Sequence, residues 1–184
     1  EMRIHAGDLH GSGVGLVGSP YILLGHNAEM AWAMTTGGPD TADVYELVLD
    51  AAGTHYRFAG EWRPLGVREV TLRYPDGSTR TRTLEFSHHG PIIARQDGKA
   101  YAARIAYDER ADRNLAWEKL NFAKDYTGAL AAGATQSLFP QNLMVADTSG
   151  NIAYQRVGRV PRRNPAYDWS KPVPGDTAAT EWQG

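Results

Sequence analysis

Short runs of β-branched and aromatic residues alternate with clusters of Gly, Pro, Asp and Asn over the first two thirds of the chain. Runs of this length between turn residues are typical of strands, so the pattern predicts a largely antiparallel sheet. The clearest hairpin joins residues 67–73 to residues 78–86 through the run Tyr74-Pro75-Asp76-Gly77. Proline presets one dihedral of such a turn, and glycine accepts a positive φ.

Two tight reversals are predicted at residues 51–54 and 59–62, each of which contains a glycine. Tyr56, Phe58 and Trp62 belong to the strands around these reversals. Aromatic side chains on one face of paired strands contact each other across the ladder. We therefore expect the three rings to pack together as core aromatics.

The spacing of apolar residues becomes helical after Asp112, which is a suitable helix cap. The apolar positions of this first predicted helix are Leu115, Ala116, Leu120 and Phe122. Thr127 is the predicted cap of a second helix over residues 128–135. The two glycines of this helix lower its stability by about 1 kcal/mol each relative to alanine.

Strands return after the second helix. Residues 143–147 and 151–157 flank Asp147-Thr148-Ser149-Gly150, which predicts another hairpin. The segment 161–175 is rich in Pro, Arg and Asn, and we expect an ordered loop or a strap that contacts a partner.

Composition narrows the function classes. The hydrophobic content of 42% and the charged content of 22% are those of an ordinary folded protein. A formal charge of -2 gives no broad basic surface, which argues against nucleic acid as a partner. No apolar run is long enough to cross a bilayer, so no membrane partner is expected. The absence of cysteine excludes a disulfide scaffold and a thiolate nucleophile.

Few residues could carry chemistry without further context. Gly37 and Gly38 follow a strand-like run over residues 30–36, and their amides could stabilise an oxyanion or merely form a turn. Asp40 and Asp43 place two carboxylates three residues apart, a set of hard oxygens that suits calcium but is also common in solvated turns. The six histidines show no paired metal-ligand spacing, so they are expected to be structural.

The run of residues 25–45, GHNAEMAWAMTTGGPDTADVY, resembles the G-H-N-x-x-x-A-W-G-x-T stretch and the D-x-x-D segment of penicillin acylases. The similarity continues in the family's order through Gly60-Glu61-Trp62, His89-Gly90-Pro91-Ile92, Ala146-Asp147, Gly150-Asn151-Ile152-Ala153-Tyr154 and Pro172-Val173-Pro174-Gly175. It covers essentially the whole chain.

This resemblance implies an N-terminal-nucleophile hydrolase, in which a serine at the start of the large subunit attacks an amide and its own α-amine acts as the base. Glu1 corresponds to a position a few dozen residues inside that subunit, so the serine is expected upstream. By position, Thr36 matches the residue whose backbone N–H helps to form the oxyanion hole. The second donor, an asparagine side chain, is expected beyond Gly184.

The resemblance also implies binding sites. A structural calcium ion is expected at Asp40, Asp43 and the carbonyl of Ala42, with a further carbonyl from Trp169, where the family has proline. The acyl-pocket positions are Leu24, Met34, Gly38 and Trp117. Because Leu24 and Gly38 replace aromatic groups of phenylacetyl-specific enzymes, an aliphatic acyl chain is at least as plausible as phenylacetyl.

The sequence thus predicts an α+β fold: part of an αββα N-terminal-nucleophile hydrolase sandwich, mostly antiparallel, with two short helices. Residues 1–184 are interpreted as one partial domain of the large subunit, inactive by itself, from an enzyme that cleaves N-acyl amides such as β-lactam side chains or acyl-homoserine lactones.

The expected partners are a small-molecule N-acyl substrate and the small (α) subunit from the same precursor, and the expected localisation is periplasmic or secreted. The alternative is a non-catalytic, calcium-dependent β-rich binding module, with exposed aromatics and Asp40 and Asp43 as its site.

Overall fold

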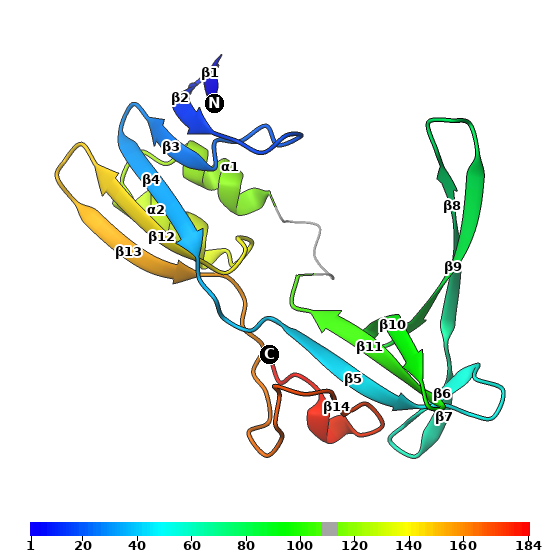
Figure 1. The fold of residues 1–184 in the computed structure, drawn as a ribbon. Coiled ribbons are helices and arrows are strands. Elements are labelled where there is room, and N and C mark those ends of the chain that lie inside the picture. The colour runs from blue at the N-terminus through cyan, green and yellow to red at the C-terminus, as the bar shows by residue number, and fades with distance from the viewer. Residues whose placement is uncertain (108–113) are drawn as a thin grey trace. The chain divides into compact units, whose positions relative to one another are not determined.

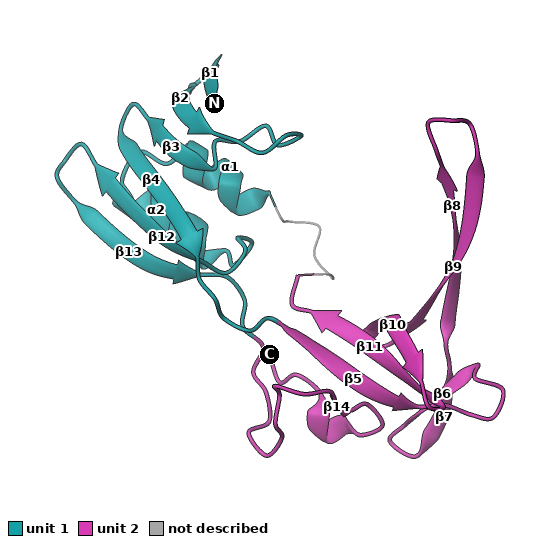
Figure 2. Cartoon of the chain, in the orientation of Figure 1, with its two compact units in different colours: residues 1–41, 109–160 teal, residues 42–108, 161–184 magenta. Residues whose placement is uncertain are grey.

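The structure is a computed structural model that describes residues 1–107 and 114–184. It divides into two compact units, each assembled from two separate stretches of the chain (Figures 1 and 2). Unit 1 comprises residues 1–41 and 109–160, and unit 2 comprises residues 42–108 and 161–184. The prediction that residues 1–184 form one partial domain of a longer subunit stays a prediction.

Unit 1 is built on a six-stranded antiparallel sheet in the order β1-β2-β3-β4-β12-β13. The strands are β1 (Met2–Ala6), β2 (Leu9–Val14), β3 (Leu24–Asn27), β4 (Met30–Thr36), β12 (Gln141–Asp147) and β13 (Ile152–Val157). The predicted strand over residues 30–36 is therefore confirmed, as is the hairpin around residues 147–150, which joins β12 to β13.

Two short helices, α1 (Leu115–Asn121) and α2 (Tyr126–Ala134), complete unit 1. Buried and exposed residues alternate along the first five positions of β4, where Met30, Trp32 and Met34 are buried. These side chains form one core with Leu143 and Val145 of β12 and with the buried residues of both helices. The alternation in β4 thus marks the face of the sheet that the helices cover.

The cap of α2 differs from the one predicted. Asp125, not Thr127, caps α2: its Oδ1 accepts from the backbone N–H of Gly128 at 2.8 Å. Thr127 lies inside the helix and donates its hydroxyl to the same oxygen at 2.6 Å. Asn114 precedes α1 without a capping hydrogen bond from its side chain. The predicted cap Asp112 lies outside the described residues.

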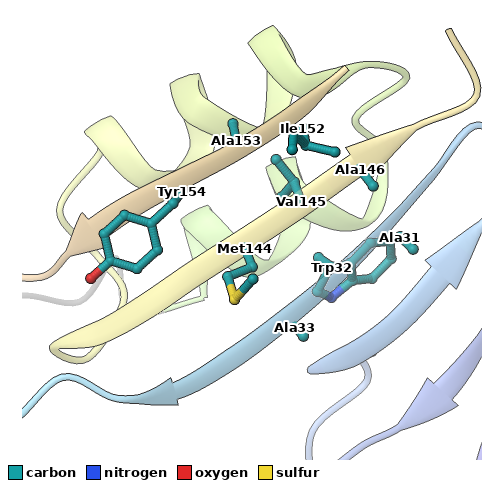
Figure 3. Close-up of a pocket in the computed structure, with 9 residues that line it drawn as sticks. All are labelled: Ala31, Trp32, Ala33, Met144, Val145, Ala146, Ile152, Ala153 and Tyr154. Atoms are coloured by element: carbon teal, nitrogen blue, oxygen red, sulfur yellow. The ribbon is translucent and has the colours of Figure 1, made fainter. Parts of the chain in front are cut away.

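The opposite face of β4, β12 and β13 is apolar and open. Met144, Ile152 and Tyr154 are 56%, 82% and 61% exposed. Figure 3 shows these side chains around a shallow hollow of about 530 Å³, with Ala31, Ala33 and Ala146 among its other lining residues. Unit 1 therefore has one helix layer on one sheet, which is half of a sandwich.

Unit 2 is built on a six-stranded sheet in the order β14-β5-β11-β10-β9-β8. The strands are β5 (Ala42–Val48), β8 (Gly66–Arg73), β9 (Thr79–Ser87), β10 (Gly90–Gln96), β11 (Lys99–Ile105) and β14 (Val173–Pro174), with β6 (His55–Phe58) and β7 (Glu61–Pro64) as a separate pair. β14 lies parallel to β5, and the other pairings are antiparallel.

The predicted turns of unit 2 are confirmed. β8 and β9 form the hairpin around residues 74–77, and β6 turns into β7 through Ala59 and Gly60, which both have positive φ. Tyr56 and Phe58 are buried as expected, but Trp62 is 51% exposed, so its assignment to the core is wrong. Trp62 faces Arg57 across the ladder, at positions that point away from the core.

The segment 161–175 is an ordered loop, one of the two forms predicted for it, and its contact with a partner stays a prediction. Residues 161–184 together are called the strap, which contributes β14 and the short 3₁₀ helix η1 (Ala178–Thr180). Buried Thr180 secures its end, because its hydroxyl donates to the carbonyl of Pro174 at 2.7 Å. The prediction of an α+β fold, mostly antiparallel with two short helices, is confirmed.

Candidate functional site

A hollow of about 260 Å³ lies in unit 1 where β4 ends. Four residues predicted to bind substrate or form the oxyanion hole line it: Leu24 of β3, Met34 and Thr36 of β4, and Trp117 of α1. Gly38 is not among the lining residues. The rest of the lining is mostly aliphatic and consists of Val14, Gly15, Leu16, Leu23, Thr35 and Gln141.

Local structure explains why these side chains meet. Met34 is the last buried residue of the alternating β4 pattern, and Trp117 lies on the buried face of α1. Leu24 begins β3 and is 38% exposed, so it forms part of the opening. The hollow thus has a buried aromatic wall and an aliphatic rim, an environment that suits an apolar group of a ligand.

The backbone N–H of Thr36 points away from β12. Thr148 donates its N–H to the carbonyl of Glu29 at 2.9 Å, and Gly37 donates to the carbonyl of Pro140 at 3.0 Å. Hydrogen-bonded and non-hydrogen-bonded pairs alternate along an antiparallel ladder, so the odd-numbered residues from 29 to 37 face β12. Thr36, opposite Gln141, is at a non-hydrogen-bonded position.

The other neighbour of β4 does not reach Thr36. The β3 ladder pairs Gly25 with Trp32 and His26 with Ala31. The amide of Thr36 is therefore directed to the side of β4 on which Leu23 and Leu24 lie, where it can donate to a group held in the hollow. This orientation is what an oxyanion donor needs.

Gly37 and Gly38, the two glycines after β4, do not form a pair of free backbone N–H donors. The N–H of Gly37 is already used by Pro140, and a Cβ on Gly37 would lie 3.0 Å from the backbone nitrogen of Gln141. Gly38 has a φ of +68°, but residues 37–40 form neither a turn nor a bend. The interpretation of this pair as a turn is therefore wrong, and so is the oxyanion role suggested for Gly37, because its N–H is already used.

Asn121, which sequence reasoning missed, holds one wall of the hollow in place. Its side chain is buried, accepts from the N–H of Ile22 at 2.8 Å and donates to the carbonyls of Ile22 and Trp117 at 2.9 and 3.0 Å. It thereby ties the segment before β3 to α1. No sequence signal marks this role, because Asn121 and Ile22 are far apart along the chain.

Asn27, the asparagine of the GHN motif, makes a related link. Its Nδ2 donates to the carbonyls of Asn121 and Ala123 at 3.1 and 2.7 Å. Its Oδ1 accepts from the N–H groups of Glu29 and Met30, both at 2.9 Å. The motif therefore fixes the turn between β3 and β4 against the end of α1.

Of the residues predicted to bind calcium, Asp43 has the clearest environment. In unit 2 its Oδ2 accepts from Arg163 Nε at 2.8 Å and from Trp182 Nε1 at 2.6 Å. Its Oδ1 is buried without a hydrogen-bond partner among the described residues. A buried carboxylate oxygen in this state fits a cation, because it otherwise loses its hydration without compensation.

The other predicted ligands are less constrained. Ala42 is the first residue of β5, and Asp40 lies in the segment before it. Trp169 is in the strap, where its ring nitrogen donates to the carbonyl of Asn164 at 2.8 Å. Calcium ligation by these residues stays a prediction.

A second polar cluster lies in unit 2. His88 Nε2 and His89 Nδ1 are 3.1 and 3.3 Å from the same oxygen of Glu181, Oε1. Burial lowers the pKa of both histidines, that of His89 to about 4, so both rings are neutral at neutral pH. Sequence reasoning missed this cluster, because Glu181 is distant in the sequence from the two histidines.

The similarity to known proteins covers the whole chain. The penicillin amidase family matches residues 1–184. Penicillin G acylase of Escherichia coli is 32% identical over 185 aligned residues, which cover 96% of this chain and 22% of that protein. Acyl-homoserine lactone acylase QuiP of Pseudomonas fluorescens is 28% identical over 191 residues, which cover 99% of this chain and 23% of the relative.

A solved structure agrees with these sequence relationships. The thermostable penicillin G acylase from Alcaligenes faecalis matches the whole chain with a TM-score of 0.89 at 27% identity, over 34% of its own chain. The present chain spans less than a quarter of the length of the curated relatives it matches. Among the described residues, no helix is long and apolar enough to cross a membrane. On these sequence and structural similarities, the chain belongs to the penicillin amidase family.

Proposed function

We propose that the protein carrying this chain hydrolyses N-acyl amides and that the hollow at the end of β4 holds the acyl group. The observation that supports this most directly is the convergence of Leu24, Met34, Thr36 and Trp117 on one hollow. Side chains from β3, β4 and α1 surround an apolar space. The backbone N–H of Thr36 is directed to the side of β4 on which this space lies. The names of two relatives, penicillin G acylase and acyl-homoserine lactone acylase, support an acylase.

In the proposed reaction, a serine outside residues 1–184 attacks the amide carbonyl, and the C–N bond breaks as the amine leaves with a proton. Water then hydrolyses the serine ester and releases the carboxylic acid. The N–H of Thr36 stabilises the oxyanion formed in both steps, together with a second donor from outside this chain. Residues 1–184 alone are therefore expected to show no turnover.

The lining of the hollow favours an aliphatic acyl chain. Leu16, Leu23, Leu24 and Met34 surround the space, and Trp117 is its single aromatic wall. Flexible aliphatic side chains accommodate an alkyl chain without demanding a planar ring. Among possible substrates, acyl-homoserine lactones and aliphatic N-acyl amides therefore rank above phenylacetyl compounds.

We also propose a structural calcium ion held by the Asp43 carboxylate, with Asp40 and the carbonyls of Ala42 and Trp169. The unpartnered Oδ1 of Asp43 supports this assignment. Calcium would neutralise this oxygen, while Arg163 neutralises Oδ2. A small subunit from the same precursor and a periplasmic or secreted location complete the proposal, which follows the resemblance to the family.

The alternative of a calcium-dependent binding module is less well supported. Its site required Asp43 to face a ligand at the surface, but the Asp43 side chain is only 1% exposed and pairs with Arg163. Membership of the penicillin amidase family also favours an enzyme.

The proposal is tested in the intact protein with chromogenic amides that carry phenylacetyl or aliphatic acyl groups. The informative variant is Thr36→Pro, which removes the proposed donor but no hydrogen bond of the β4–β12 ladder. We expect kcat to fall about 100-fold to 1,000-fold, as for loss of one oxyanion donor. Thr36→Ala keeps the N–H and should keep kcat.

Thr35→Pro is the matched structural control, because residue 35 is at a hydrogen-bonded position of the ladder and proline there removes a bond. It should lower the melting temperature more than Thr36→Pro does. Equal activity of Thr36→Pro and wild type would refute the oxyanion role, and no turnover of any N-acyl amide would refute the proposed reaction.

A further inference from the structure

Two imidazoles and a carboxylate of unit 2 converge on one point. His88 and His89 form the turn between β9 and β10, and Glu181 follows η1 in the strap. One nitrogen from each ring and one carboxylate oxygen lie within 4.8 Å of one another. The His89 side chain is completely buried, whereas His88 and Glu181 remain 27% and 29% exposed, so the cluster is open to solvent on one side.

The second nitrogen of each ring already has a fixed partner. His89 Nε2 lies 3.1 Å from the carbonyl of Gly175, which can only accept, so this nitrogen carries a proton. His88 Nδ1 lies 2.9 Å from the hydroxyl of Tyr56. Histidines that bind metals show this arrangement: the nitrogen away from the metal contacts a carbonyl or another polar group that fixes the ring orientation.

The remaining nitrogen of His89 has an unsatisfied lone pair. With Nε2 protonated in the neutral ring, Nδ1 has no hydrogen, yet it faces Glu181 Oε1 at 3.3 Å. Nδ1 is buried and forms no hydrogen bond within the described part of the chain. A lone pair facing a carboxylate oxygen at this distance is unfavourable unless a cation lies between the two atoms.

We propose that His88, His89 and Glu181 bind a divalent transition-metal ion of the zinc class. Ligands about 2.0 to 2.1 Å from a tetrahedral zinc ion lie about 3.3 Å from each other. The two contacts with Glu181 Oε1, 3.1 and 3.3 Å, match this spacing. Two imidazoles and one carboxylate are also a preferred ligand set for zinc, with water in the fourth position.

The surroundings leave this position accessible to an ion. Arg104 donates to Glu181 Oε2 at 2.9 Å and lies over the ring of Trp182, so it occupies the other carboxylate oxygen. Oε1 remains directed at the two histidines. A metal here would fasten the strap to the β9–β10 turn, a link that is independent of the proposed amide hydrolysis.

The experiment uses the intact protein, stripped with a chelator, resupplied with calcium and titrated with Zn²⁺ by calorimetry. Wild type should bind one equivalent of Zn²⁺. The affinity for this ion should be lower by about tenfold or more in His88→Ala and in Glu181→Gln. Co²⁺ in place of zinc should give the visible absorption of a tetrahedral site. Tyr56→Phe, which removes only an outer partner, should weaken binding by about tenfold.

His55→Ala is the matched control, because His55 is an exposed histidine of unit 2 that pairs with Asp50 instead. The double variant His5→Ala, His10→Ala tests adventitious binding to the exposed histidine pair of unit 1. Both should bind zinc like wild type.

Absence of Zn²⁺ uptake by wild type would overturn the proposal, since a proton would then be the only cation at the cluster. Equal Zn²⁺ binding by wild type, His88→Ala and Glu181→Gln would also overturn it. If Glu181→Gln fails to fold after losing its charged contact with Arg104, His88→Ala decides the outcome, because its side chain is partly exposed.

Discussion

The two units of this chain stabilise similar sheets by different means. Unit 1 covers one sheet face with α1 and α2, and its core is almost entirely apolar. Unit 2 has no α-helix among its described residues, and the strap brings polar groups such as Arg163, Thr180 and Glu181 to buried or partly buried positions. The first arrangement depends on apolar area, whereas the second depends on polar groups that need specific partners.

The largest expected effect tests the polar arrangement of unit 2. Asp43→Ala would remove the buried carboxylate that accepts from both Arg163 and Trp182. We expect the local free energy of unfolding to fall by about 3 to 5 kcal/mol, measured by hydrogen exchange of the β5 and β11 amides in chelator. Asp50→Ala, at a partly exposed carboxylate of the same unit, is the control, and an equal loss there would disprove the special role of Asp43.

The helix layer of unit 1 is tested by Leu120→Ala. Leu120 is fully buried in α1, and its truncation should cost about 2 to 5 kcal/mol through lost burial and a cavity. Leu115→Ala, at a 38% exposed site of the same helix, should cost much less. Hydrogen exchange in β4 and β12 reports both changes, and similar values for the two variants would contradict a helix-based core.

A smaller effect is expected at Asn121, a buried polar residue of unit 1. Asn121→Ala would leave the buried N–H of Ile22 unpaired and should cost about 1 to 3 kcal/mol. Because Asn121 also connects this segment to Trp117, KM for the amide substrate should rise more than kcat falls. An unchanged KM in a folded variant would show that Asn121 does not position the hollow.

The smallest effect concerns pH at the start of α2. The hydroxyl of Thr127 and then the N–H of Gly128 donate to Asp125 and lower its pKa. Since the folded pKa is below the ordinary one, this cap stabilises α2 fully above about pH 4 and is progressively lost as the pH falls further. Hydrogen exchange of α2 amides should show this loss.

Asp125→Asn keeps an acceptor oxygen, so it should reduce the pH dependence without abolishing the cap. Some dependence should remain, because Asp147 accepts from the N–H of Tyr126 at 3.2 Å and its pKa is also lowered, chiefly by Asn151. An undiminished pH response in the variant would rule out Asp125 as its source.

Local chemistry explains which parts of the fold the sequence predicted. The turns at residues 74–77 and 147–150 contain their own determinants, so both hairpins were predicted nearly to the residue. The cap of α2 was misplaced because Asp125 and Thr127 are both good capping residues and only tertiary context distinguishes them. Contacts between distant segments, such as β14 with β5, carried no local signal.

The candidate site shows the same division. Leu24, Met34, Thr36 and Trp117 were predicted from the resemblance to the family and do line one hollow, whereas Gly38 does not. Asn121 and the pairing of Asp43 with Arg163 were missed, because each depends on residues about a hundred positions apart. Periodicity and spacing describe neighbours along a strand or helix, and they contain no information about such partners.

The interleaving of the two units has a consequence for synthesis of the protein on the ribosome. The sheet of unit 1 lacks its last two strands until residue 157 has emerged. In unit 2, Asp43 has no hydrogen bonds from Arg163 and Trp182 until these residues have been synthesised. Unit 1 cannot be completed until most of unit 2 has been translated, and unit 2 is completed only with the last segment of this chain. The nascent polypeptide therefore exposes unpaired strand edges for most of its elongation, which makes early chaperone binding advantageous.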